Sequence, residues 1–142
     1  MKLVQNFHFL LFSLSSFSPP APLQAAYIVK ASHFDVEYSL GHKITLICLA
    51  KGNPLPRITW MKELVEIVPH PFLKVNAALQ AAEIAVNFKV CVQITEWRIE
   101  ESEIKSKFEI DPARQMDAGA YSCQANNKYA VDQKHFKVDP LI

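Results

Sequence analysis

The sequence predicts an all-β protein built as an antiparallel sandwich of two sheets. Three observations lead to this prediction. Several short segments alternate apolar and polar residues with a period of two, the repeat of a β-strand. Clusters of Pro, Asn and Gly separate them as turns. Two cysteines, Cys48 and Cys123, fall on the inward faces of two such segments, and a third, Cys91, lies between them in the sequence.

The first alternating segment spans Gly41–Gly52, in which Leu46 and Cys48 share the inward face. Its other face carries Ile47 and Leu49, which predict an apolar patch unless another part of the chain covers it.

Asn53–Pro56 predicts a turn that leads into a second strand, Arg57–Met61. This strand is rich in β-forming residues, and Trp60 lies on its inward face. A short edge strand is expected at Leu64–Ile67.

The second half of the chain repeats the pattern. Ser106–Ile110 predicts a strand with Phe108 and Ile110 pointing inward. Gly119–Asn127 predicts the next strand, and its final asparagines, followed by Lys128, predict a tight turn because Asn tolerates positive φ. His135–Val138 closes the series.

The spacing of four residues identifies the kind of sandwich. Trp60 follows Cys48 by twelve residues, and Tyr121 lies two residues before Cys123. An inter-sheet disulfide, a tryptophan packed on it and a tyrosine corner together define the immunoglobulin fold. We therefore expect a disulfide between Cys48 and Cys123. By reducing the conformational entropy of the unfolded chain, it should stabilise the folded state by about 4 kcal/mol. Cys91 is left over.

The motif around the second cysteine predicts how the tyrosine corner is built. We expect the Tyr121 hydroxyl to donate to backbone just upstream and Gly119 to leave space at the start of its strand. Asp117 is expected to pair with one of three basic residues: Lys105, Lys107 or Arg114.

These residues resemble the I-set immunoglobulin domains of cell adhesion and axon-guidance proteins. "GHKITLICLAKGNPLPRITWMKE" and "FEIDPARQMDAGAYSCQANN" carry the resemblance, which covers about residues 28–70 and 95–140. The stretch Lys105–Asp139 resembles the C-terminal half of the small secreted one-immunoglobulin-domain proteins of nematodes and insects. The resemblance implies an extracellular binding protein of neural or neuromuscular surfaces. One departure is Leu64, where I-set domains commonly have Gly after an acidic residue.

A larger departure is the stretch Pro69–Trp97, centred on an atypical insertion at residues 70–95. It is long for a connection inside a compact sandwich. We consider three interpretations: a mis-spliced or retained-intron segment, a real insertion with a helix in "NAALQAAEIAVNF", or a V-like domain with an extra strand at Phe88–Ile94. Cys91 lies in this stretch and is either a buried or incidental thiol or the site of an intermolecular disulfide.

The N-terminus has the pattern of a secretory signal peptide over residues 1–26. Lys2 precedes an apolar run from Phe7 to Phe17, and small residues follow. Cleavage is expected between residues 18 and 26, leaving a single domain at 27–140. The run is too short to span a bilayer, so no membrane span is expected.

Composition and motifs exclude several classes of function. A formal net charge of +1 gives no basic field for nucleic acid. No nucleophile motif, phosphate loop or metal-ligand spacing is present in the 142 residues, so we expect no enzyme, cofactor or metal. The carboxylates of "EWRIEESE" (Glu96–Glu103) are read as a solvated face.

One face of the predicted sandwich is the candidate binding surface. Its outward residues should be Arg57, Thr59, Met61, Ser122, Gln124 and Asn126. A polar surface that includes Arg and Met suits a protein interface. We expect a secreted protein that docks on cell-surface or matrix proteins, among them receptors or other immunoglobulin-domain proteins, in adhesion, axon guidance or receptor organisation at synapses. A homodimer is also compatible, and the alternative is an intracellular structural module like those of muscle proteins.

Overall fold

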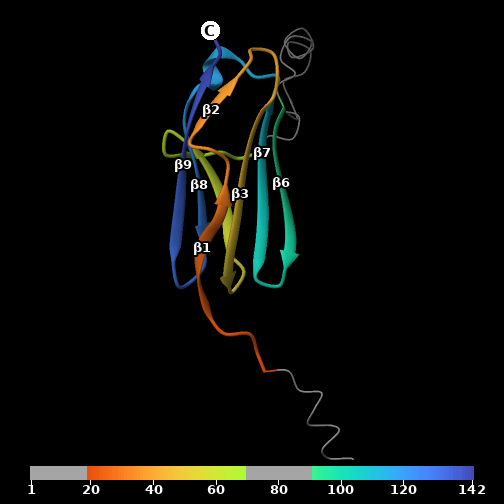
Figure 1. The fold of residues 1–142 in the computed structure, drawn as a ribbon, viewed down its shortest axis with the longest axis vertical. Helices are drawn as coiled ribbons and strands as arrows, with labels where there is room; N and C mark the ends of the chain where they lie inside the picture. Colours follow the sequence, from red (N-terminus) through yellow and green to blue (C-terminus); the bar gives the residue numbers. More distant parts are fainter. Residues whose placement is uncertain (1–18, 70–90) are drawn as a thin grey trace, which may run out of the picture.

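Two β-sheets packed face to face make up the described part of the chain, residues 19–69 and 91–142, in a computed structural model (Figure 1). In sheet order, the four-stranded sheet contains β1 (Gln24–Ala31), β3 (Ile44–Asn53), β7 (Glu103–Asp111) and β6 (Cys91–Glu100). The five-stranded sheet contains β2 (Asp35–Tyr38), β9 (Val131–Pro140), β8 (Gly119–Asn126), β4 (Arg57–Lys62) and β5 (Val65–Glu66). The predicted all-β immunoglobulin-like sandwich is confirmed.

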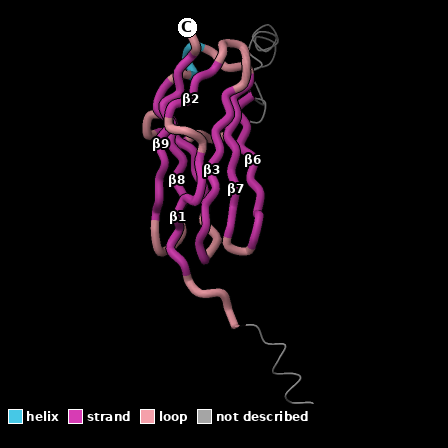
Figure 2. Tube along the Cα trace, viewed as in Figure 1, coloured by secondary structure: helices cyan, strands magenta, loops and turns pink. Residues whose placement is uncertain are grey.

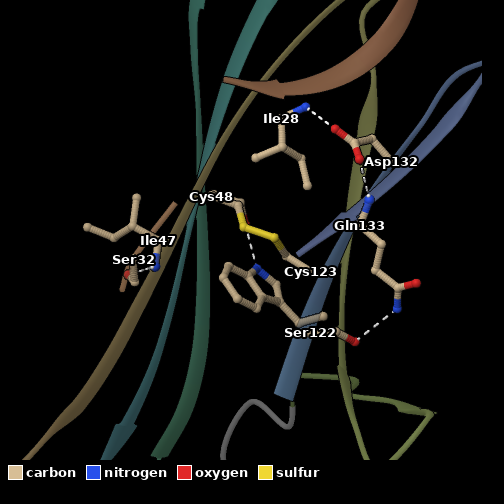
Figure 3. Close-up of a disulfide and its surroundings, with 10 residues drawn as sticks. Ile28, Ser32, Ile47, Cys48, Ser122, Cys123, Asp132 and Gln133 are labelled. Carbon is tan, nitrogen blue, oxygen red and sulfur yellow. Dashed lines mark hydrogen bonds between the residues drawn. A yellow bond between two sulfur atoms is a disulfide. The ribbon is translucent and has the colours of Figure 1, made fainter. Parts of the chain in front are cut away.

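The first strand region crosses from one sheet to the other, as Figure 2 shows. β1 pairs antiparallel with β3, whereas β2 pairs parallel with β9. Ser32 lies at the crossing, where its hydroxyl accepts a hydrogen bond from the Ile47 amide at 2.8 Å (Figure 3). Neither strand was predicted, because β1 begins within the expected cleavage range and β2 has only four residues.

β6 lies in the stretch for which the sequence left three interpretations open. Cys91–Glu100 pairs antiparallel with β7, at the edge of the four-stranded sheet. An extra V-like strand would instead have lengthened the other sheet beside β5, so residues 91–94 contradict that interpretation, and residues 88–90 lie outside the described residues. Residues 91–95 of the expected insertion therefore belong to a regular strand. The helix expected in "NAALQAAEIAVNF" lies outside the described residues.

The core forms around the disulfide between Cys48 on β3 and Cys123 on β8, which joins the two sheets (Figure 3). Trp60 is 1% exposed, and its indole nitrogen donates to the Ser106 hydroxyl at 2.8 Å. The Trp60 and Phe108 rings stack with centroids 5.6 Å apart. The remaining predicted core side chains are also buried: Leu46, Ile110 and Tyr121.

Two tyrosine hydroxyls fasten the turn between β7 and β8. Tyr121 donates to the Asp117 carbonyl at 2.6 Å, and Tyr38 donates to the Arg114 carbonyl at 2.6 Å. Within the turn, the Arg114 amide donates to an Asp117 carboxylate oxygen at 2.7 Å, which also lies 3.8 Å from the Arg114 Nε atom. Of the three basic candidates, Arg114 is the residue that pairs with Asp117.

Gly119 leaves space for the side chain of Glu63, which lies between β4 and β5. Its φ is +150°, and a Cβ atom there would lie 2.7 Å from a Glu63 carboxylate oxygen. That oxygen accepts a hydrogen bond from the Ala120 amide at 3.0 Å. Any larger residue at position 119 would displace this contact.

Asn127 connects three separate segments at the end of the sandwich opposite the tyrosine corner. Its side-chain oxygen accepts from the amides of Ala26, Tyr129 and Ala130 at 3.0–3.2 Å. Its side-chain nitrogen donates to the carbonyls of Gln24 and Pro54. Sequence analysis predicted a turn residue here, but not the fastening of β1 to this turn.

We expect Tyr121→Phe to lower the free energy of unfolding by about 1–2 kcal/mol, since the Asp117 carbonyl loses its donor while the ring stays packed. Denaturant unfolding measures this difference. Tyr129→Phe is the matched control, because Tyr129 is 45% exposed. Equal effects of the two substitutions would contradict the role assigned to the Tyr121 hydroxyl.

Tyr121 should also make stability depend on alkaline pH. Burial, and then the charge of Asp117, raise the pKa of Tyr121 above its usual value. The unfolded chain releases this proton near pH 10 while the folded chain keeps it, so the stabilisation is present below pH 10 and is lost as pH rises. We expect the stability difference between wild type and Tyr121→Phe to narrow by about 1 kcal/mol from pH 9 to 11. A constant difference would contradict it.

Candidate protein-binding face

The outer face of the five-stranded sheet brings the predicted binding residues together. β4 and β8 pair in a register that sets Arg57 opposite Asn126, Thr59 opposite Gln124 and Met61 opposite Ser122. Residues two apart share a face of a strand, so these three cross-strand pairs form one continuous surface. We call these six residues, together with Glu66, the binding face; β5 places Glu66 opposite Met61.

A shallow hollow of about 490 Å³ lies on the binding face. Its lining residues are Arg57, Thr59, Met61, Glu66, Gln124, Asn126, Asn127 and Lys128. The lining thus contains five of the six residues singled out from the sequence, and adds two charged side chains. The lining is mostly polar, with Met61 as its apolar residue, and a surface of this mixture suits contact with another protein.

Charges of both signs line the hollow without neutralising one another. Arg57 and Lys128 are positive, and Glu66 is negative. Within residues 19–69 and 91–142, no ion pair forms to any of these three side chains. The Arg57 guanidinium is exposed and keeps its donors available for a carboxylate or carbonyl of a partner.

Ser122 contributes little to this surface. It is only 4% exposed, although the sequence predicted an outward residue. Its place in the sheet explains this, because Met61 lies opposite on one side and His135 on the other. Its hydroxyl accepts a hydrogen bond from the Gln133 side chain at 3.3 Å, as Figure 3 shows.

The hairpin that joins β4 to β5 is held against the tyrosine corner. The Glu63 amide donates to the Ala120 carbonyl at 2.9 Å, and the Lys62 ammonium donates to the Met116 carbonyl at 2.7 Å. Glu63 and Leu64 both have positive φ, 49° and 66°. Leu64 is 84% exposed, so the departure from Gly noted in the sequence places an apolar side chain at the tip of the turn.

A second surface lies on the outer face of the four-stranded sheet. Ile47 and Leu49 are half-buried there, and the register sets Leu49 beside Lys105 and Lys105 beside Trp97. Trp97 is 42% exposed, with the Lys105 and Lys107 ammonium groups 5.7 and 5.5 Å from its ring centroid. Sequence analysis missed this surface. Thr95, Trp97 and Ile99 recur with a period of two, which could have indicated a strand, but the carboxylates around them led to the interpretation as a solvated face.

Among the described residues, no group of three or more His, Cys, Asp or Glu side chains could hold a metal ion. No helix in that part of the chain is long and apolar enough to cross a membrane. What the binding face offers chemically is hydrogen bonding, one unpaired guanidinium and an apolar Met61.

A sandwich with this strand order, disulfide and tyrosine corner defines an immunoglobulin domain. The family model "Immunoglobulin domain" matches residues 28–127. The chain belongs to the immunoglobulin domain family, whose members are typically non-enzymatic.

Two relatives come from Caenorhabditis elegans. The chain is 38% identical over 116 residues to "Immunoglobulin domain-containing protein oig-4", which covers 82% of this chain and 63% of that protein. It is 29% identical over 112 residues to "Immunoglobulin domain-containing protein oig-1", covering 79% of this chain and 67% of that protein. These matches confirm the resemblance to the small one-immunoglobulin-domain proteins of nematodes. The match to oig-4 spans less than two thirds of that protein.

A solved structure shows the same fold. It is the crystal structure of Dpr2 Ig1-Ig2 in complex with DIP-Theta Ig1-Ig3, with a TM-score of 0.66 and 19% sequence identity. The similarity covers 87% of this chain and 39% of the other. At this identity the likeness establishes the fold alone.

Proposed function

We propose that the chain is a secreted, non-enzymatic binding protein that docks its binding face on cell-surface or extracellular-matrix proteins. It acts in cell adhesion, axon guidance or the organisation of receptors at synapses, including the neuromuscular junction. The observation that carries this proposal is the hollow at the binding face, with an exposed Arg57 that forms no ion pair in the described part of the chain. Arg is enriched at protein interfaces and among the residues that contribute most of the binding free energy.

Receptors or other proteins with immunoglobulin domains are the partners we favour. In the structure of Dpr2 with DIP-Theta, immunoglobulin domains of two proteins form a complex. One standard interface buries about 800 Å² on each partner, which a single domain of this size can present. No nucleic-acid partner is proposed, because the net charge is close to zero.

Secretion is supported by the leader pattern of residues 1–26 and by the disulfide. Disulfides persist in oxidising compartments and are rare in the cytosol, which weighs against the intracellular muscle-type module. Residues 1–18 lie outside the described residues. Because β1 begins at Gln24, cleavage after Ala26 would remove its first three residues, whereas cleavage after Ser18 would leave it whole.

We expect the protein made in cultured insect cells to appear in the medium, beginning between Pro19 and Tyr27, with Cys48 joined to Cys123. Non-reducing peptide mass mapping of medium and lysate measures the first residue and the pairing. The same map shows whether Cys91 is free or bridged, and whether the stretch at 70–90 is retained. A full-length, reduced chain confined to the lysate would instead favour the intracellular module.

We expect Arg57→Glu and Met61→Asp each to weaken binding to a partner ectodomain about tenfold or more, because both residues line the hollow and Arg and Met are enriched at protein interfaces. Surface plasmon resonance against a panel of purified immunoglobulin-domain ectodomains measures this effect. Lys30→Glu is the matched control, since Lys30 is exposed on β1 in the other sheet.

Arg57 and Lys30 are exposed, so Arg57→Glu and Lys30→Glu should change the free energy of unfolding by no more than about 0.5 kcal/mol. Equal loss of binding in Lys30→Glu and Arg57→Glu would contradict the placement of the site. The absence of binding to every ectodomain would contradict the proposed class of partner.

A further inference from the structure

β6 forms one edge of the four-stranded sheet. It has ten residues, Cys91–Glu100, and on its outer side no strand pairs with it in the described part of the chain. An edge strand of this length presents a row of backbone donors and acceptors to which another strand can pair. Two large apolar residues are exposed along it: Trp97 at 42% and Ile99 at 51%.

Charged side chains alternate with these apolar residues. Glu96 lies opposite Ser106 and Arg98 lies opposite Ile104 on β7, so both are on the inner side of the sheet, yet both are exposed. The Arg98 guanidinium donates to the Glu101 carbonyl at 3.3 Å. Neither Glu96 nor Arg98 forms an ion pair within residues 19–69 and 91–142.

We propose that β6 pairs antiparallel with β6 of a second copy of this chain, with the two Trp97 residues facing each other. In this register Glu96 of each copy faces Arg98 of the other, so two ion pairs form. Thr95 faces Ile99, which lies within the register shift between Arg98 and Glu100. The interface thus combines an aromatic pair, two pairs of opposite charge and new backbone hydrogen bonds.

The sequence of β6 selects this register over its neighbours. Facing residues in such a symmetric pair lie on the same side of the sheet, so the axis passes through a residue. Centring on Glu96 or on Arg98 brings two like charges together, and centring on Thr95 sets each charge opposite an apolar residue. Of these four central registers, only the one at Trp97 gives opposite charges without a like-charge pair.

Charges on an edge strand usually discourage pairing with other chains. Here they exclude wrong registers and other strands, and they favour one self-complementary arrangement. The lysines beside Trp97 support this arrangement, because Lys105 and Lys107 already lie over its ring on the outer face.

The paired molecule would have one continuous sheet of eight strands. The binding face lies on the outer side of the other sheet, although Arg57, Thr59 and Glu66 also share a hollow with Ile94 and Glu96 of β6. The dimer would therefore present two binding faces, which raises the apparent affinity for partners clustered on one surface.

The test is sedimentation equilibrium of the secreted full chain over a range of concentrations. We expect a reversible dimer in wild type, weakened about tenfold or more by Glu96→Lys and equally by Arg98→Glu, because each substitution converts both attractive pairs into repulsive ones. An equimolar mixture of the two variants should recover the dimer, since every facing pair then again has opposite signs. Glu37→Lys on β2 and Lys30→Glu on β1 are the controls and should leave the dimer unchanged, because both residues are exposed and lie away from β6.

Each other result would overturn the proposal. A wild-type chain that stays monomeric at all concentrations excludes the pairing. Single variants that dimerise like wild type, or a mixture that stays monomeric, exclude this register. Loss of the dimer in Glu37→Lys would move the interface to the five-stranded sheet. A dimer that disappears when disulfides are reduced would be a covalent one and not the β6 pairing.

Discussion

The disulfide between Cys48 and Cys123 fixes which side of β3 and of β8 faces inward. It lies between β3 and β8, where the two sheets pack, with Trp60 and Phe108 stacked in the same core. A slip of one residue in either strand would turn its buried side chains outward and its surface side chains inward. The covalent link forbids such a slip. The same constraint that makes the core fixes Gln124 and Asn126 on the binding face.

The strands with clear alternation could be predicted from the sequence, and those without it could not. β3, β4, β7 and β8 each have one buried and one more exposed side, so a period of two is visible in their residues. β1 has two register shifts in its pairing with β3, and β6 has one between Arg98 and Glu100. The charges of β6 also resemble those of a loop.

The residues of the candidate site could be predicted where the alternation of side chains along a strand decides which face they occupy. This alternation placed Arg57, Thr59 and Met61 on one face of β4. It gave no information on whether larger neighbours cover a small side chain. Ser122 is buried because two larger residues flank it across the sheet. Long-range contacts such as those of Asn127 were equally hidden, since its partners at Ala26 and Pro54 are far away in the sequence.

The clamped hairpin between β4 and β5 has a consequence for how tightly the binding face can hold a partner. Glu63 and Lys62 fasten the turn that carries Glu66, so this part of the surface is already ordered before any encounter. A surface that is already ordered loses little conformational entropy on association. Its affinity therefore depends mainly on the contacts themselves, and loosening the clamp would weaken binding without removing a single contacting side chain.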